Sequence, residues 1–236
     1  MPVASSNVPG FDDTSVALKA VRLIGIVGYT PVLDMFPLSG LLVDNLRRAL
    51  PSDGSIAIEN MSWGPIHIVQ RFQDPEAVRP ERLVLVGAAS ISTCPGRVRA
   101  FCWQGGKLPT EAVQERMYEA VTGIVDIENT LVIGEHFDIW PDECFVVEAD
   151  MPAETFGCMV IAHSEKRAED SMLARELGFS PRRMRHDIAV TAAALAVEGP
   201  KARVPLDEKF ATALPPSAKF MRNRFTFATE EDGKGG

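Results

Sequence analysis

The side chains in this 236-residue chain that could carry out chemistry are four cysteines, four histidines and many carboxylates. The cysteines contain no Cys-x-x-Cys pair, so their spacing does not predict a zinc or redox site. Thiols scattered in this way are typical of reduced, buried cysteines in a cytosolic protein. They are Cys94, Cys102, Cys144 and Cys158.

Sequence motifs that assign a reaction are missing. There is no Gly-x-Ser-x-Gly elbow, no His-Glu-x-x-His pair and no Walker loop. The stretch Gly25-Ile-Val-Gly28 lacks the spacing of a dinucleotide-binding loop, and Pro31 and Pro37 interrupt the approach to the next helix. We therefore expect no nucleotide-dependent chemistry at this loop.

Each of the four histidines has a structural interpretation. His67 falls in a short amphipathic helix, where we expect a partly buried packing role. His136 lies near the end of a predicted helix, where a cation stabilises the helix C-terminus. His163 follows an apolar run in a loop. His186 closes the basic run 182–186, which we interpret as a solvated helix face or a row of intrahelical ion pairs.

Strands that alternate with helices position these side chains. The strands are apolar runs rather than strict alternations, which predicts a mainly parallel sheet covered on both faces. The expected fold is a three-layer α/β/α sandwich with a largely parallel five-stranded sheet, of the phosphorylase/hydrolase-like kind. The stretch 97–103 alternates and indicates an edge strand. The expected strands are 22–28, 55–60, 82–86, 97–103 and 144–148; the expected helices are 40–50, 65–72, 110–119, 124–137, 169–177 and 180–197.

Composition divides the chain into three parts. Residues 1–20 are small, polar and marked by proline, and predict an N-terminal arm. Residues 21–199 form the α/β domain. From residue 200 onward the strand-helix pattern fails, which indicates a C-terminal extension over 200–236.

Charge and hydropathy restrict the class of protein. Apolar residues make up 46% and charged residues 24% of the chain, which suits a globular domain. The net charge of -8 disfavours nucleic acid as a partner, because phosphate binding needs a basic face. The apolar stretch from Leu23 to Leu33 is too short to span a bilayer, and residues 1–20 lack the features of a signal peptide. We therefore expect a cytoplasmic protein that does not insert into membranes.

The order of several short motifs is similar to that of the hydrogenase maturation endopeptidases. This family clips the C-terminus of the nickel-iron hydrogenase large subunit after nickel insertion. The resemblance runs from about Arg22 to Glu198. The motifs that carry it are Leu23–Gly28 with Ser39–Val43, Trp63-Gly64, Arg82–Ala88 with Cys94–Val98, Thr122–Asp126, and Leu177–Pro181.

The resemblance implies three ligands that recognise nickel in the substrate for metal-assisted hydrolysis. They are an acidic residue after the first strand, an aspartate ending the third strand, and a histidine before a later glycine. In this sequence the three positions hold Met35, Gly87 and Ala120. Glycine and alanine have no side-chain donor atom. The sequence therefore predicts that the family's metal site is lost, and that no metal or other cofactor is bound.

A substitute set of ligands remains an alternative. Asp34, Glu59 and Glu119 could all lie near strand ends and hold nickel in their place. The competing interpretation is that they are solvated surface carboxylates.

The segment 219–227 mixes basic and aromatic residues, which are the usual anchors of protein interfaces. We expect Lys219, Phe220, Arg222, Arg224 and Phe225 to bind a protein partner. The alternative is a strap that packs back onto the acidic body.

Together these features predict a catalytically degenerate protein of this family, which binds or helps to assemble a metalloprotein such as a nickel-iron hydrogenase large subunit. Two alternatives stay open. One is an active nickel-dependent endopeptidase that uses the substitute carboxylates. The other is a structural subunit of a redox complex.

Overall fold

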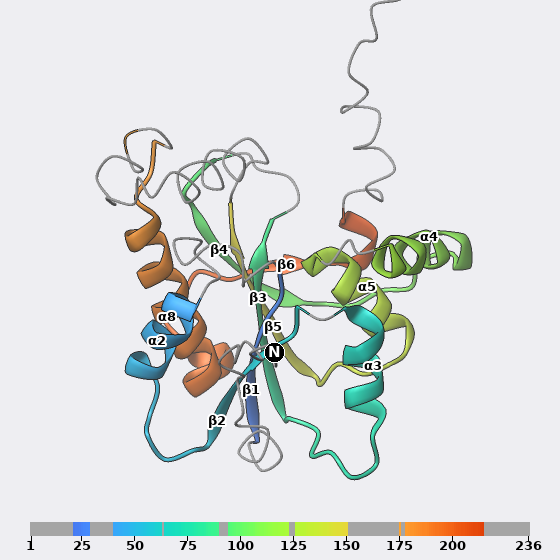
Figure 1. Ribbon diagram of the computed structural model, residues 1–236, viewed down its shortest axis with the longest axis horizontal. Coiled ribbons are helices and arrows are strands. Elements are labelled where there is room, and N and C mark those ends of the chain that lie inside the picture. Colours follow the sequence, from blue (N-terminus) through green and yellow to red (C-terminus); the bar gives the residue numbers. More distant parts are fainter. Residues whose placement is uncertain are drawn as a thin grey trace, which may run out of the picture.

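A six-stranded sheet forms the centre of the computed structural model, which describes residues 21–28, 40–62, 64–89, 94–122, 126–150, 175 and 178–214. The strand order is β2-β1-β3-β5-β4-β6 (Figure 1). The strands are β1 (Arg22–Ile26), β2 (Ile56–Asn60), β3 (Arg82–Ala88), β4 (Val98–Trp103), β5 (Glu143–Ala149) and β6 (Asp207–Lys209).

Four neighbouring strands, β2, β1, β3 and β5, run parallel, and β4 pairs with β5 in the antiparallel sense. The α/β class and the largely parallel sheet are therefore confirmed. The sixth strand, β6, comes from the segment after residue 200, where we expected no element. It pairs with β4 and takes the edge position that the alternating pattern predicts for β4.

Helices cover both faces of the sheet (Figure 1). Helices α2 and α8 lie on one face, and α3, α4 and α5 lie on the other. Side chains of adjacent strand residues point to opposite faces, so Ile24 and Val84 pack with α2 and α8, whereas Leu23 packs with α3 and α5. The helices are α2 (Gly40–Ala49), α3 (Pro65–Gln73), α4 (Thr110–Val121), α5 (Ile127–His136) and α8 (Pro181–Glu198), with 3-10 turns at Gly199–Lys201 and Ala211–Ala213.

Local sequence signals explain the helix ends. The Ser180 side chain accepts a hydrogen bond from the Arg183 backbone N–H, and Pro181 occupies the first helical position of α8. Gly199, with φ of 60°, ends the same helix. The Asp126 side chain caps α5, which begins later than the expected residue 124. The expected helix over 169–177 lies almost wholly outside the described residues.

The parallel strands end at one edge of the sheet, where ligands bind in open α/β folds. The segments that follow these strands are 29–39, 63, 90–93 and 151–174, and they lie outside the described residues. Within the described part of the chain, no helix combines the length and apolar character needed to cross a membrane.

Candidate functional site

Gly87 lies near the carboxyl end of β3 and packs directly against helix α5. A Cβ atom built on Gly87 would lie 2.8 Å from Cδ1 and 2.9 Å from Cβ of Ile127. Both distances are shorter than any ordinary contact between carbon atoms. A carboxylate therefore does not fit at residue 87 unless α5 moves away from the sheet.

Ala120, which falls at the position where the resemblance implies a histidine, is half-buried on α4. It packs against the apolar cluster on the α3–α5 face. Its surroundings are those of a packing residue. Met35 and the substitute ligand Asp34 lie outside the described residues.

Glu59 stands on β2 and is paired with an arginine. Its Oε1 and Oε2 accept hydrogen bonds of 2.8 and 2.9 Å from Arg71 Nε on α3. Both side chains are 16% exposed, so the pair is largely shielded from solvent. The pair joins the edge strand β2 to the helix that follows it.

Glu119 is buried on α4, with 4% of its surface exposed. Its Oε2 lies 4.0 Å from Arg116 Nη1, which donates a hydrogen bond of 3.0 Å to Asn129 Oδ1. Glu59 and Glu119 thus belong to separate ion pairs. Among the described residues, no three His, Cys, Asp or Glu side chains are placed to hold a metal ion.

A charged group that the sequence interpretation missed lies where α5 and β6 approach the end of β5. We call it the buried ionic cluster; it consists of Arg99, Asp126, Glu128, Glu148 and Lys209. Glu148 is only 1% exposed and contacts Lys209 Nζ through Oε1. Lys209 Nζ also lies 3.9 Å from Glu128 Oε1, and Arg99 Nη2 lies 3.8 Å from Glu148 Oε2. In the sequence, the one sign of this cluster was Glu148, the acidic residue that follows the apolar run of β5.

Two groups of the buried ionic cluster, Asp126 and Lys209, have pKa values shifted from their ordinary values. Burial, aided by the Glu128 carboxylate, raises the pKa of Asp126 to about 7. The Asn129 backbone N–H, 2.6 Å from Asp126 Oδ1, and the Arg116 guanidinium oppose this rise. Burial also lowers the pKa of Lys209, against the opposing effect of Glu128. Asp126 can therefore exchange a proton near neutral pH.

The histidines confirm the sequence interpretation only in part. His67 is exposed, so the expected packing role is wrong. His136 is the last residue of α5, as expected, and its ring meets Phe137 edge-on at 5.1 Å. His186 is exposed near the start of α8. His163 lies outside the described residues.

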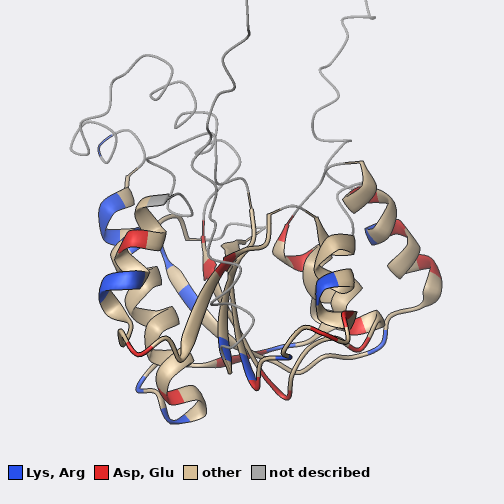
Figure 2. Ribbon diagram, turned by 60° about the horizontal axis from the view of Figure 1, so that its bottom comes forward, with Lys and Arg blue, Asp and Glu red and all other residues tan. Residues whose placement is uncertain are grey.

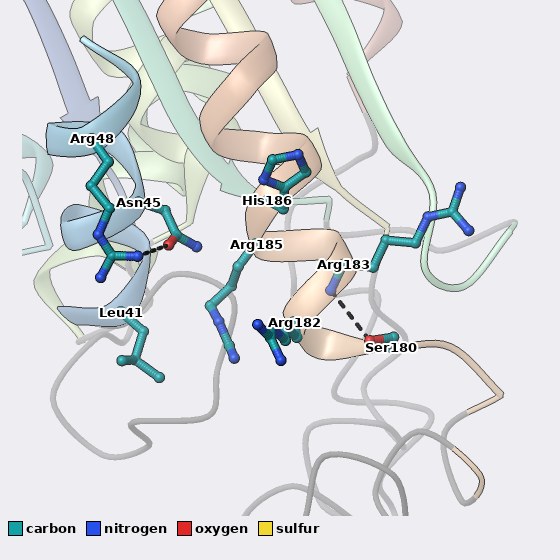
Figure 3. A pocket seen from close by; sticks show the side chains of 8 residues that line it. All are labelled: Leu41, Asn45, Arg48, Ser180, Arg182, Arg183, Arg185 and His186. Carbon is teal, nitrogen blue, oxygen red and sulfur yellow. Dashed lines mark hydrogen bonds between the residues drawn. The ribbon is translucent and has the colours of Figure 1, made fainter.

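The basic run 182–186 is more than a solvated face. One intrahelical pair is present, between Arg183 Nε and Asp187 Oδ2 at 3.8 Å. All the basic residues of the run, Arg183 included, line a cleft between α2 and α8. Figure 2 shows basic residues on the two helices of this face, and Figure 3 shows the side chains that line the cleft. The signal in the sequence was the density of arginine after a helix cap.

The described cysteines are Cys94, Cys102 and Cys144, and all three carry free thiols. Burial raises the pKa of Cys144 strongly and that of Cys102 moderately, so both thiols are poor nucleophiles. Cys94 is exposed, contrary to the expectation that the cysteines are buried. The expected partner-binding residues 219–225 lie outside the described residues.

The fold and these contacts define an α/β sandwich in which the described acidic side chains near the strand ends are largely tied to arginine or lysine. Comparison with protein-family models, curated proteins and solved structures finds no match for this chain.

Proposed function

We propose that this protein is a non-catalytic relative of the hydrogenase maturation endopeptidases that binds a metalloprotein partner and assists its assembly. The partner we propose is of the nickel-iron hydrogenase large-subunit type. The observation that carries the proposal is the packing of Gly87 against Ile127, because a hydrocarbon side chain fills the place of the family's aspartate.

The pairing of the carboxylates also supports binding rather than hydrolysis. Glu59 is held by Arg71, Glu119 lies beside Arg116, and Glu148 contacts Lys209. A divalent cation would have to displace these positive side chains to gain a carboxylate ligand. Such an exchange leaves a buried cation without its counter-charge, which is costly.

The proposed class of partner and the proposed location of the protein follow from its charge and from its thiols. The net charge of -8 disfavours nucleic acid, and the basic and aromatic segment 219–227 is the proposed contact with the protein partner. The free thiols of the described cysteines support a cytoplasmic location.

The test uses the full chain with a nickel-loaded large-subunit precursor that retains its C-terminal extension. We expect saturable binding in biolayer interferometry and no change in precursor mass after prolonged incubation. Precursor cleavage would overturn the non-catalytic role, and loss of that cleavage in Asp34→Ala would favour the endopeptidase alternative. Failure of the precursor to bind would overturn the proposed partner.

Matched variants locate the contact. Phe220→Ala/Phe225→Ala should weaken precursor binding by about tenfold or more, because aromatic anchors dominate interface energies. Phe210→Ala, at an exposed position outside the segment, serves as the control. A partner that exchanges with free precursor supports an assembly factor, whereas a permanent stoichiometric complex would indicate a structural subunit instead.

A further inference from the structure

A second cavity lies on the opposite face of the sheet, between the loop after β4 and the helices α4 and α5, which pack on that face (Figure 1). Its volume is about 330 Å³. This is the lower end of the range for small-molecule sites, so only a small ligand fits. The described residues around it include 106–108 of the loop, Val113 of α4, and Val132 and Glu135 of α5.

Glu135 presents a carboxylate of fixed orientation to this cavity. Its Oε2 accepts a partly buried hydrogen bond of 2.9 Å from Trp103 Nε1. Its Oε1 accepts an exposed and longer bond of 3.3 Å from the Gly106 backbone N–H. A carboxylate oxygen can accept two hydrogen bonds, so Oε1 can accept another donor from the cavity side.

The loop that closes over Glu135 is tied to the end of the sheet. A Cβ atom built on Gly105 would lie 2.5 Å from Glu135 Oε1, so only glycine lets the loop come this close. The Gln104 backbone N–H donates to the Lys209 carbonyl at 2.9 Å, and the Ala211 N–H donates to the Gly105 carbonyl at 2.8 Å. The carboxylate side of the cavity is therefore formed before a ligand arrives, which lowers the entropic cost of binding.

The charge of Glu135 is not neutralised by a neighbouring side chain. Both of its hydrogen-bond donors are neutral groups. Within the described part of the chain, no lysine, arginine or histidine forms an ion pair with it, whereas Glu59 and Glu148 are each paired with a cation. An ammonium group on a ligand would supply the missing counter-charge through a charge-assisted hydrogen bond.

Lys107 and two valines restrict the rest of the ligand. Lys107 also lines the cavity, is exposed and, among the described residues, forms no ion pair. It would repel a ligand that carries an ammonium group alone, and its flexible stem can reach a carboxylate on the ligand. Val113 and Val132 are 4% and 2% exposed and supply an apolar wall. An ammonium group, a carboxylate and a hydrocarbon chain together describe an aliphatic amino acid.

We propose that the cavity between α4 and α5 binds a free aliphatic amino acid. Glu135 Oε1 accepts from its ammonium group, Lys107 pairs with its carboxylate, and its side chain packs against Val113 and Val132. This site goes beyond the proposed assembly role and does not depend on it.

The test is isothermal titration of the full chain with L-leucine at constant ionic strength. Two further probes each lack one charged group, namely isoamylamine without the carboxylate and 4-methylpentanoate without the ammonium group. We expect saturable binding of leucine at one site, and binding of each further probe weaker by at least about tenfold, the loss of one charge-assisted contact. Absence of saturable leucine binding would overturn the site. Binding of either further probe as tight as that of leucine would overturn the amino-acid class.

Matched variants assign the binding to the cavity. Glu135→Gln should weaken leucine and isoamylamine alike by at least about tenfold. Lys107→Gln should weaken leucine to a similar extent but should not weaken isoamylamine, which has no carboxylate. Because Lys107 is exposed, this variant keeps the test decisive even if Glu135→Gln disturbs the contact with Trp103.

Two exposed residues that are not among the described lining residues provide the controls. Glu111→Gln at the start of α4 and Lys201→Gln after α8 should leave the leucine affinity within about twofold, as expected for surface charges. Effects of the cavity variants no larger than those of the controls would overturn the assignment. Circular dichroism would verify that all four variants are folded.

Discussion

Asp126 caps helix α5 and lies close to a second carboxylate, that of Glu128. Its Oδ1 accepts the Asn129 backbone N–H at 2.6 Å, so the side chain has a structural role whatever its charge. Burial and Glu128 favour the protonated form, which raises the pKa to about 7. One side chain therefore serves both as a helix cap and as a group that titrates near neutral pH.

We expect this titration to affect the free energy of unfolding. The folded chain keeps the Asp126 proton up to about pH 7, whereas the unfolded chain releases it near the ordinary value of 3.8. The contribution of Asp126 to stability is therefore complete below about pH 4 and is lost as the pH rises to about 7. Asn is also a good cap and stays neutral, so Asp126→Asn should become progressively more stable relative to the wild type over this range.

Urea unfolding between about pH 4.5 and about pH 7.5 measures the difference, since the range spans the change of protonation. Asp142→Asn, at an exposed position, is the control. A constant difference between Asp126→Asn and the wild type across the range would contradict the raised pKa.

Among the helices and strands, β3 and α5 approach each other closely at Gly87. The absence of a side chain at Gly87 lets Ile127 pack against the strand. Ile127 is 1% exposed and belongs to the apolar cluster of that face. The same packing that stabilises the sandwich therefore occupies the position where a ligand could have projected.

Gly87→Ala should destabilise the protein by about 1–3 kcal/mol, because an added methyl group overpacks the contact with Ile127. In an Ile127→Ala background the penalty should be clearly smaller, although not zero, since the Ile127 Cβ itself lies 2.9 Å from the new atom. Urea unfolding of the four proteins in a double-mutant cycle measures this coupling.

Leu131→Ala is the matched background, because it removes another buried side chain of α5 that is not among the atoms nearest to Gly87. There the penalty of Gly87→Ala should be unchanged. An equal penalty in both backgrounds would show that the contact with Ile127 does not determine the fit.

On the scale of the whole molecule, the described residues after 200 add the last strand of the sheet. They also supply the lysine that pairs with a buried carboxylate of β5. Strand β6 pairs with β4, and Lys209 contacts Glu148 from a position 61 residues later in the chain. Ala202, Val204 and Leu206 pack against the apolar cluster on the α2–α8 face. Residues 201–214 are therefore packed against the sheet.

Lys209→Ala should destabilise the protein by about 3–5 kcal/mol, because it removes one partner of a buried ion pair. The cost should fall in a Glu148→Gln background, where the buried carboxylate that contacts Lys209 is already neutral and only that of Glu128 stays charged beside it. Glu208→Ala, at the exposed neighbouring position, should change the stability by less than about 0.5 kcal/mol. Thermal and urea unfolding compare the variants, and similar costs for Lys209→Ala and Glu208→Ala would contradict the role of the pair.

Much of the fold could be read from local sequence. Parallel strands buried on both faces appear as continuous apolar runs, so β1, β3 and β5 were predictable. Helix α8 was predictable because Ser180-Pro181 and Gly199 mark its ends by their own conformational preferences. These signals act within a few residues and do not depend on the rest of the chain.

Three features were decided only by the tertiary structure. Strand β6 has the sequence Asp-Glu-Lys, which carries no strand pattern and becomes a strand because β4 offers free hydrogen-bonding groups. The buried ionic cluster draws residues from β4, α5, β5 and β6 and from the cap of α5, and the cleft between α2 and α8 is lined by Arg48 together with residues near 182. Apart from β6, local sequence determined which of these elements form, because conformational preference is a property of neighbouring residues. Only folding determined which charges meet, because electrostatic contact depends on distance in space rather than along the chain.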